Sequence, residues 1–487
     1  MKTFFKILFF LTILLLILSY GIFVYFKNNF SWEKILQNNF AQEQVSKILT
    51  NDSDSDLFAT AANFLGFTET KKYLVLFLND TEIRPAGGFI GSYAVISVDK
   101  GKINLLKLEG SESLDKNSPE DWRPAPPEIL KKELGVEKWY FRDANWSPDF
   151  SVSAKKVLEL YKGEGGFEAE NIDAVVAVDT KVLEEILNLT GEIEVSDLKF
   201  NSKNVVEKLE YEVEYAFLEK GYDFSQRKNI LKDLADKVLA EVKVDIFFHW
   251  QDYKNLLDKM IREKHISAYF VDQNLSDSLK NFPEYDNLFG KIINTKNDED
   301  YLLWVDANLA ALKTDWAIKR SLNYKIEKNS DGHYIAKAKM TYIHNGSFDW
   351  RTTRYRTYAR IYVPFGAKLL AINSQSDLKQ LKYDFGEELE KTYFAYFFVI
   401  EPGKTETLEF VYQLPESIEK KIENSEYTLF VQKQIGIIES GLTLDLNFDK
   451  NIVSAEPSEL EKNWNDNKYF LTENLLTDKK IDIKLAK

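Results

Sequence analysis

Residues 73–108 read YLVLFLNDTEIRPAGGFIGSYAVISVDKGKINLLKL, and this stretch decides the fold of the region around it. The run Tyr73–Leu78 is continuously apolar, which is typical of a strand buried on both faces of a sheet. Tyr93–Val98 predicts a second strand, and Asp99–Lys102 predicts a tight turn into a third strand, Ile103–Leu108. The stretch therefore predicts the first three strands of a sheet.

Strands alternate with helices further along the chain. Ile172–Val178 predicts another buried strand, and Thr180–Leu189 predicts a helix that ends at Gly191. Longer helices are expected near 202–220, 225–242 and 251–263. This alternation indicates an α/β domain with a mainly parallel sheet flanked by helices, and we place it at residues 71–320.

Beyond residue 320 the pattern changes to short segments in which apolar and polar residues alternate. Turn signals separate the segments, for example Glu401–Lys404, where Pro and Gly suit a type II turn. About six such segments predict an all-β sandwich at residues 321–450. Residues 451–487 are rich in charge and predict a polar tail.

The N-terminus predicts a membrane anchor. Ile7–Phe26 contains no charged side chain, and a helix of that length spans the ~30 Å hydrocarbon core of a bilayer. No small-residue cleavage site follows, so residues 1–27 are expected to stay as an uncleaved signal anchor. Lys2 and Lys6 favour a cytoplasmic N-terminus. Residues 28–70 then predict a helical stalk, and the rest of the chain is expected outside the cytoplasm, on the cell membrane.

Composition excludes several classes of function. The chain of 487 residues carries a formal net charge of −14, which argues against a nucleic-acid partner. It contains no cysteine and four histidines, none with the i, i+4 spacing of a helical zinc site. The G-x-S-x-G pattern of serine hydrolases is also absent. We therefore expect no metal and no cofactor.

The segment Asn79–Tyr93 carries the densest chemical signal. It follows a buried strand, at the edge of the sheet where α/β proteins bind ligands. Its glycines expose backbone N–H groups, and an arginine adds a charged donor, so we expect an anion-binding loop formed by Arg84, Gly87, Gly88 and Gly91. The alternative is a tight structural turn in which Arg84 pairs with Glu82 or Asp80.

Two further segments allow two interpretations each. Four side chains share one face of the strand 354–360: Arg354, Arg356, Tyr358 and Arg360. They form either a basic stripe for an anionic wall polymer or a solvated outer face. Residues 143–149 either line a cleft or supply carboxylates, or they form a loop in which Ser147 or Asp149 caps the next helix. The abundant aromatic residues also allow two interpretations: they form sugar-stacking platforms, or most of them belong to the hydrophobic core and the sheets.

Four segments resemble an uncharacterised bacterial family, domain-of-unknown-function family 4012. They are NDTEIRPAGGFIGSYAVISVDKGKI (79–103), NWSPDFSVSAKKVLELY (145–161), NIDAVVAVDTKVLEEILNLTGEIEV (171–195) and VDANLAALKTDWAIKRS (305–321). The resemblance covers most of residues 70–450. It implies family membership and says almost nothing about function.

A more distant resemblance is to the LytR–CpsA–Psr phosphotransferases, which move glycan phosphates from polyprenyl carriers to the cell wall. Residues 172–195 are similar in layout to a segment of that family. Tyr222–Leu231 resembles its D-x-x-R-x-x-R-Q-Q helix, so Asp223 and Arg227 match the Asp and one Arg. The chain departs from the family where Tyr211–Glu214 replaces an R-x-R pair that grips pyrophosphate. It also has Gly91-Ser92-Tyr93 in place of a Ser-Asp-Thr magnesium ligand.

Two functions follow as expectations. The first is a non-catalytic binding or scaffolding module of the bacterial cell envelope, anchored by its N-terminal helix. The alternative is a LytR–CpsA–Psr-like phosphotransferase that uses Mg²⁺. Both imply a membrane partner and either a cell-wall glycan or a polyprenyl-phosphate lipid. The residues expected to bind the anionic group are Arg84, Gly87, Gly88, Gly91 and Arg227.

Overall fold

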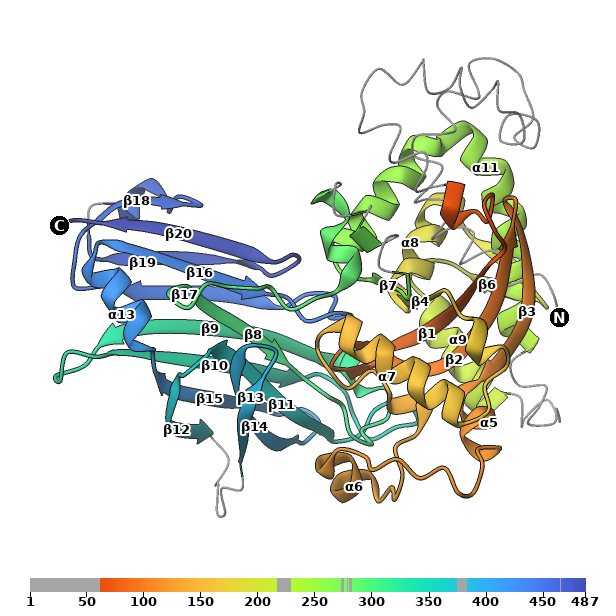
Figure 1. Ribbon diagram of the computed structural model, residues 1–487, viewed down its shortest axis with the longest axis horizontal. Coiled ribbons are helices and arrows are strands. Elements are labelled where there is room, and N and C mark those ends of the chain that lie inside the picture. Colours follow the sequence, from red (N-terminus) through yellow and green to blue (C-terminus); the bar gives the residue numbers. More distant parts are fainter. Residues whose placement is uncertain are drawn as a thin grey trace.

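A computed structural model describes residues 62–216, 229–272, 276–277, 279, 283–374, 383–464 and 466–487. The predicted anchor at 1–27, most of the predicted stalk at 28–70 and Arg227 lie outside these residues. Within them, no helix has both the length and the apolar composition that crossing a bilayer requires. Figure 1 shows an α/β part joined to an all-β part, which carries the C-terminus.

Five strands form the main sheet of the α/β part, in the order β3-β2-β1-β4-β7. Their bounds are β1 (Lys71–Arg84), β2 (Gly87–Asp99), β3 (Lys102–Gly110), β4 (Ala174–Asp179) and β7 (Ile266–Phe270). β1 pairs parallel with β4, whereas β1–β2, β2–β3 and β4–β7 are antiparallel. The prediction of a mainly parallel sheet is therefore wrong. The cause is the short links between β1, β2 and β3, because parallel neighbours need a connection of about a dozen residues or more.

Helices cover both faces of this sheet. The main ones are α7 (Phe150–Gly163), α8 (Thr180–Thr190) and α11 (Asn229–Arg262). α7 packs on the face to which Leu74 points, and α8 and α11 pack on the face to which Val75 points. Because successive strand residues point to opposite faces, the apolar run predicted at Tyr73–Leu78 supplies both cores.

Local sequence sets the ends of these helices. The Asp149 carboxylate caps α7 and the Asp179 carboxylate caps α8, each accepting a backbone N–H of the first turn. Gly191 ends α8 with φ at 85°, a conformation that glycine adopts without steric cost. α11 is interrupted at His249, whose backbone angles are not helical. It thus joins the two helices predicted near 225–242 and 251–263.

Short elements complete the α/β part. They are α5 (Ser111–Lys116), α6 (Glu128–Leu134), η1 (Phe141–Asp143), η2 (Ala169–Asn171), β5 (Ile193–Val195), β6 (Leu198–Phe200), α9 (Val205–Tyr211), the π-helix η3 (Glu212–Ala216) and η4 (Pro283–Phe289). α5 and η1 lie on the same face of the sheet as α7, and their Leu114 and Phe141 join its core.

Two sheets form the all-β part and enclose one hydrophobic core. The six-stranded sheet has the order β12-β15-β10-β9-β17-β19. Its bounds are β9 (Ile318–Lys328), β10 (Tyr334–His344), β12 (Lys368–Ser374), β15 (Thr405–Gln413), β17 (Gly441–Asn447) and β19 (Lys468–Asn474). In β9, buried Leu322, Tyr324 and Ile326 alternate with more exposed residues, which is the periodicity that predicts strands.

The seven-stranded sheet has the order β13-β14-β11-β8-β16-β20-β18. Its bounds are β8 (Asp300–Val305), β11 (Tyr355–Pro364), β13 (Asp384–Glu388), β14 (Lys391–Ile400), β16 (Glu426–Gln432), β18 (Ile452–Glu456) and β20 (Lys479–Leu485). The short helices of this part are η5 (Thr314–Ala317), α13 (Glu416–Glu423) and η6 (Glu461–Asn463).

Strands of this part come from outside the range 321–450 that the sequence predicts for it. β8 lies inside the predicted α/β range, yet it pairs with β11 and β16. Residues 451–487, predicted as a polar tail, supply β18, β19 and β20. In β20 the core side chains are separated by charged ones, so the composition reads as polar although Ile481 and Ile483 are buried.

Polar contacts join the two parts. The backbone N–H of Ile83 donates to the Asp315 carboxylate at 3.0 Å, and its carbonyl accepts from Asn308 N at 3.0 Å. The Gln434 side-chain amide donates to the carbonyl of Arg84 at 3.1 Å. Lys313 also pairs with Glu82 across this boundary. The segment Asn79–Tyr93 is therefore where the two parts meet, and we call this contact region the junction.

Candidate functional site

Arg84, the central residue of the predicted anion loop, is buried in the junction with 4% of its surface exposed. Its Nε donates to Asp143 Oδ1 at 3.1 Å, and its Nη1 donates to the carbonyl of Asn308 at 2.5 Å. The ring of Phe89 lies under the guanidinium, 5.2 Å from it. Breaking a buried ion pair of this kind costs about 3–5 kcal/mol. The guanidinium thus joins the two parts.

The loop glycines allow close packing within the junction. A Cβ on Gly88 would lie 2.1 Å from the carbonyl carbon of Asn79, because β1 and β2 approach closely there. A Cβ on Gly87 would lie 2.6 Å from Leu78 Cδ1, and Gly87 has φ at 106°. Nothing lies within 4 Å of the position of a Cβ on Gly91. The structure thus brings Arg84, Gly87 and Gly88 together, whereas Arg227 lies outside the described residues.

The predicted internal partners of Arg84 have other contacts. Glu82 pairs with Lys313, and the Asp80 carboxylate accepts from the Thr180 hydroxyl. Burial and the nearby Asp179 carboxylate raise the pKa of Asp80. The arginine therefore pairs with neither residue that the sequence offers as its partner.

A cavity of about 650 Å³ lies beside the junction, at the carboxyl ends of β1 and β4. Its lining includes Asp80 and, from the all-β part, Arg351 and Arg320. Both arginines are ion-paired, Arg351 with Glu210 at 2.7 Å and Arg320 with Asp306 at 2.9 Å. The Arg351–Glu210 pair joins the two parts, whereas the Arg320–Asp306 pair lies within the all-β part. In the described ranges, no three Asp, Glu or His side chains group closely enough to hold a metal ion.

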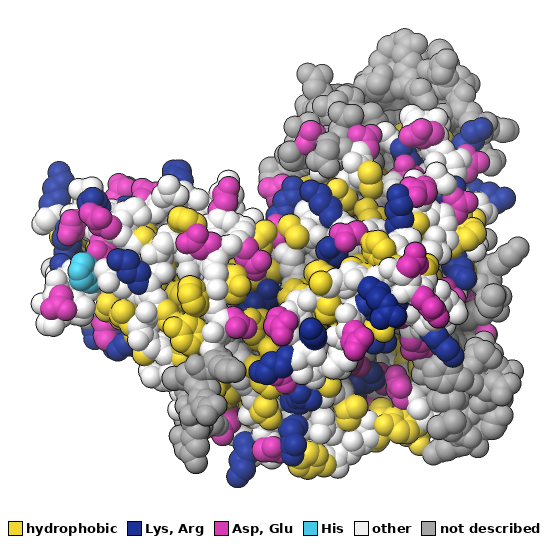
Figure 2. Space-filling view, turned by 60° about the horizontal axis from the view of Figure 1, so that its bottom comes forward, with side chains coloured by type: hydrophobic (Ala, Val, Ile, Leu, Met, Phe, Trp, Pro, Cys, Tyr) yellow, Lys and Arg dark blue, Asp and Glu magenta, His cyan; other side chains and the backbone are white. Residues whose placement is uncertain are grey.

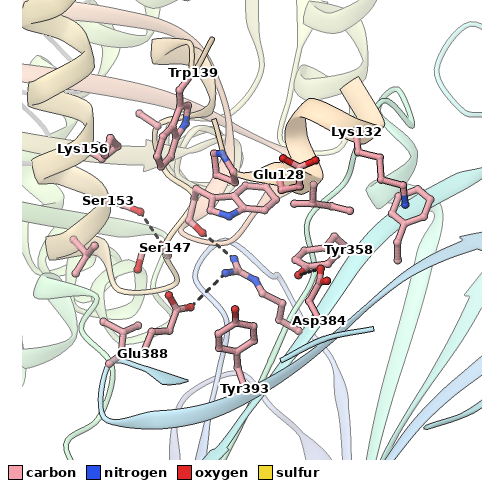
Figure 3. Close-up of a pocket in the computed structure, with 18 of the residues that line it drawn as sticks. Glu128, Lys132, Trp139, Ser147, Ser153, Lys156, Tyr358, Asp384, Glu388 and Tyr393 are labelled. Atoms are coloured by element: carbon pink, nitrogen blue, oxygen red, sulfur yellow. Dashed lines mark hydrogen bonds and ion pairs between the residues drawn. The ribbon is translucent and has the colours of Figure 1, made fainter. Parts of the chain in front are cut away.

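A larger cleft, of about 930 Å³, lies between α6, α7 and the loop before α7 on one side and β11, β13 and β14 on the other. In Figure 3, Trp139, Ser153 and Lys156 of the α/β part face Glu388 and Tyr393 of the all-β part. Ligand sites are often found in concave spaces between domains, lined by apolar and aromatic side chains with a few polar groups. This cleft is the candidate functional site.

Part of the α/β wall of the cleft comes from residues that the sequence singles out at 143–149. Trp146 and Ser147 line the cleft, and Asp149 caps α7 directly after them. The segment therefore lines the cleft and caps the helix after it, but neither of its carboxylates, Asp143 or Asp149, belongs to the cleft lining. Trp139 is half-buried, and its indole N–H donates to the carbonyl of Asp143 at 2.9 Å. The helix cap and this hydrogen bond hold the loop before α7, which forms this part of the wall, in place.

The all-β wall comes from alternate residues of β11. Tyr358 and Arg360 point into the cleft, as their shared face predicts. Arg356 pairs with Glu133 at 3.1 Å, and Arg354 pairs with Glu401 at 3.1 Å, so neither lies in the cleft. Half of the predicted stripe thus lines the cleft, and the other half is ion-paired outside it.

Arg360 lies at the floor of the cleft, between aromatic rings. The rings of Trp146 and Tyr358 are stacked, with centroids 6.1 Å apart and planes 16° apart. The guanidinium lies 5.1 Å from the centroid of Trp146 and donates to the carbonyl of that residue at 2.8 Å. Its Nε is buried and has no hydrogen-bond partner among the described residues, and an unpaired buried donor costs about 1–3 kcal/mol.

Carboxylates and basic groups surround these rings. The Tyr358 hydroxyl donates to Asp384 Oδ2 at 2.8 Å, and burial together with this carboxylate raises the pKa of the phenol. The cleft lining contains four acidic and four basic side chains: Glu128, Glu159, Asp384, Glu388, Lys132, Lys155, Lys156 and Arg360. Figure 2 likewise shows acidic and basic side chains interspersed on the face that it draws. The cleft therefore suits a polar ligand that also has apolar surface.

Sequence reasoning missed the acidic residues of β13 and the rings of β14. Asp384, Glu388, Tyr393 and Phe397 line the cleft, yet no motif in the sequence marks them. Gly386 is the one local signal, since a Cβ there would lie 2.8 Å from the ring of Tyr393. Only the pairing of β13 with β14, which is long-range information, explains that glycine.

Comparison with solved structures gives only weak likenesses. A candidate nutrient-binding protein from Legionella pneumophila matches at 7% identity and a TM-score of 0.25, over 38% of this chain and 70% of its own. Leukotriene A4 hydrolase from Saccharomyces cerevisiae matches at 11% identity and a TM-score of 0.19, over 36% of this chain and 28% of its own. An M1 zinc metallopeptidase from Deinococcus radiodurans matches at 9% identity and a TM-score of 0.15, over 36% of this chain and 43% of its own. Likenesses this weak carry no argument about fold or function.

Sequence comparison is more specific. No curated protein matches the chain. One family model matches residues 68–213 of this chain, which run from just before β1 to the π-helix η3. The matched segment contains the predicted anion loop and the α/β wall of the cleft, but not β11, β13 or β14. Residues 68–213 match the family described as protein of unknown function, DUF4012, as the sequence predicted; three of the four segments that carry the resemblance lie in this range, and the fourth, 305–321, lies outside it.

Proposed function

We propose that the protein is a binding module of the bacterial cell envelope, anchored by one N-terminal helix, whose cleft holds a glycan outside the cytoplasm without reacting with it. One observation carries the proposal. The cleft combines half-buried aromatic rings, such as Trp139 and Tyr393, with charged side chains that can bind hydroxyl groups. We propose in addition that the two facing sheets are the β-sandwich that the sequence predicts.

Sugars need this combination of groups. The C–H face of a pyranose ring is apolar and packs against aromatic rings, while its hydroxyls need hydrogen-bond donors and acceptors. Trp139 and Tyr393 supply rings from opposite walls. Asp384 and Lys156 supply an acceptor and a donor beside them. A cleft of about 930 Å³ has room for a short stretch of oligosaccharide.

The phosphotransferase alternative has less support. Phosphoryl transfer needs cations that neutralise developing charge. The guanidinium of Arg84 is engaged with Asp143 and Asn308, and the other predicted arginine, Arg227, lies outside the described residues. No specific observation on the described residues favours this reaction over binding, so it is not proposed.

Binding to purified envelope glycans tests the proposal. The full chain, purified in detergent, should bind soluble cell-wall oligosaccharides in calorimetry. Tyr393→Ala removes a ring from the cleft and should weaken binding about two- to tenfold, since a well-placed aromatic contact contributes about 0.5–1.5 kcal/mol. Phe348→Ala is the matched control, because Phe348 is 63% exposed and lies outside the cleft.

The proposal fails if no envelope glycan binds, or if the two variants weaken binding equally. Vesicles that contain polyprenyl phosphate serve as the second probe. Binding to these vesicles without binding to glycans would assign the site to the lipid, which the sequence offers as the other partner, and would overturn the glycan proposal.

A further inference from the structure

The guanidinium of Arg360 has unused hydrogen-bonding capacity at the floor of the cleft. Only 5% of the side chain is exposed. Its Nη2 donates to the carbonyl of Trp146 at 2.8 Å, and its Nε has no hydrogen-bond partner. Its Nη1 lies 3.6 Å from Glu388 Oε1, which is an ion pair but too long for a hydrogen bond. Of its five N–H donors, most therefore lack an acceptor in the part of the chain that the structure describes.

Aromatic rings account for the burial of this charge but not for its donors. The guanidinium carbon lies 5.1 Å from the ring centroid of Trp146, 5.9 Å from that of Tyr358 and 5.7 Å from that of Tyr362. Cation–π contacts stabilise a cation over a ring face. They supply no acceptor in the plane of the guanidinium, where its N–H groups point. The floor is therefore complementary to an oxyanion.

Glu388 occupies the approach to this donor set. Its side chain is 42% exposed, and its Oε1 accepts from the buried Tyr362 hydroxyl at 2.5 Å. It is the last residue of β13, an edge strand that pairs with β14 only. A carboxylate of the protein thus lies beside Arg360 without making the close, paired contact that a carboxylate and a guanidinium prefer.

We propose that the cleft recognises a carboxylate on its glycan, bound by Arg360, and that Glu388 is the internal anion that this carboxylate displaces. The ligand class is an acidic oligosaccharide whose sugars carry a carboxylate. This inference rests on the proposed function and names the kind of glycan. The four acidic and four basic side chains of the lining favour one negative charge over the two of a phosphate monoester.

The test compares an acid with its own ester. The probes are a galacturonic acid oligomer, its methyl ester and a neutral oligosaccharide of equal length, each titrated into the full chain in detergent. The acid should bind about tenfold or more tightly than the ester, because only the acid offers a charged acceptor to Arg360. Glu388→Gln should raise the ratio of acid to ester affinity several-fold, because it removes the competing charge.

Two variants keep the result interpretable. Arg360→Lys keeps the charge but loses the planar donor fork, so the preference for the acid should fall at least tenfold. Glu416→Gln is the matched control: Glu416 lies on α13, its side chain is 77% exposed, and its substitution should leave every affinity unchanged. A melting curve for each variant establishes that it is folded.

The outcomes separate the two proposals. Equal binding of acid and ester, with no effect of Glu388→Gln, would overturn the carboxylate inference and leave glycan binding standing. Binding of the neutral oligosaccharide alone would have the same meaning. Failure of all three sugars and of the envelope glycans to bind would remove the proposed function, and the inference with it.

Discussion

The segment Asn79–Tyr93 and the cleft contrast sharply in how their charges are used. In the segment, the guanidinium of Arg84 is buried and engaged by Asp143 and by the carbonyl of Asn308. In the cleft, the guanidinium of Arg360 is equally buried, but among the described residues only its Nη2 donates a hydrogen bond and its buried Nε has no acceptor. A buried arginine with satisfied donors stabilises a fold, whereas one with unsatisfied donors facing a cavity is available to a ligand.

The glycines show the same contrast. A Gly-rich turn that follows a buried strand has the appearance of a ligand loop in sequence. In this protein Gly87 and Gly88 are used to bring backbone and side chains into close contact at the junction. A high density of glycine and charged residues therefore indicates that another group approaches the backbone closely. Here that group belongs to the protein itself.

Arg84→Ala should give the largest effect on stability. It leaves the Asp143 carboxylate buried with its main partner removed, so the free energy of unfolding should fall by about 3–5 kcal/mol. Chemical denaturation measures this loss. Arg123→Ala is the control, because Arg123 is exposed and should change stability by about 0.5 kcal/mol or less. A stable Arg84→Ala protein with weakened glycan affinity would reverse the assignment of the two regions.

Gly88→Ala and Gly91→Ala should separate the structural and the tolerant parts of the predicted loop. The added methyl of the first would lie 2.1 Å from the Asn79 backbone, and that of the second would meet nothing within 4 Å. Crowding of this kind costs about 1–3 kcal/mol, so only Gly88→Ala should lower the midpoint of denaturation clearly. Equal losses in both variants would show that close packing does not explain the glycine at 88.

The acidic pair of Asp115 on α5 and Glu164 at the C-terminal end of α7 should make the stability of the protein depend on pH. Burial, followed by the charge of Glu164, raises the pKa of Asp115 to about 8, although Arg142 lowers it in part and Asp143 raises it further. Within the described residues, both oxygens of Asp115 are buried without a hydrogen-bond partner, although Oδ2 lies 3.4 Å from Arg142 Nη1 in an ion pair. The folded protein therefore holds a proton that the unfolded chain has already lost at neutral pH.

The direction in which stability changes with pH follows from this raised pKa of Asp115. The contribution of Asp115 to stability is fully present below about pH 4, where the unfolded chain is also protonated, and is lost as pH rises to about 8. The slope is at most about 1.4 kcal/mol per pH unit. Denaturation between about pH 5 and pH 9 should show this decline, and Asp115→Asn should flatten it. A decline that persists in Asp115→Asn would mean that other groups cause it.

Much of the α/β part could be predicted from local sequence. The hairpin of β2 and β3, the strand β4, the helix α8 and the cap at Asp149 all follow from short-range patterns. The direction of pairing did not follow, because it depends on which distant strands meet. The strands of residues 451–487 were hidden because charged residues alternate with the few apolar ones that reach the core.

The cleft could be predicted only in halves. The sequence marked Tyr358 and Arg360 by their shared strand face, and marked Trp146 and Ser147 within 143–149. Nothing local shows that these two segments face each other, since they belong to different parts of the molecule. The acid that approaches Arg360, Glu388, comes from a third segment, so its role depends wholly on tertiary structure.

Hydrogen–deuterium exchange of the full chain, with and without a bound oligosaccharide, tests most directly whether the cleft or the predicted loop binds the ligand. The uronic acid oligomer is the probe, at a concentration that saturates binding in calorimetry. We expect slower exchange in residues 139–147, β11 and β13 and no change in residues 79–93. Slower exchange confined to residues 79–93 would contradict the account and return the site to the Gly-rich loop.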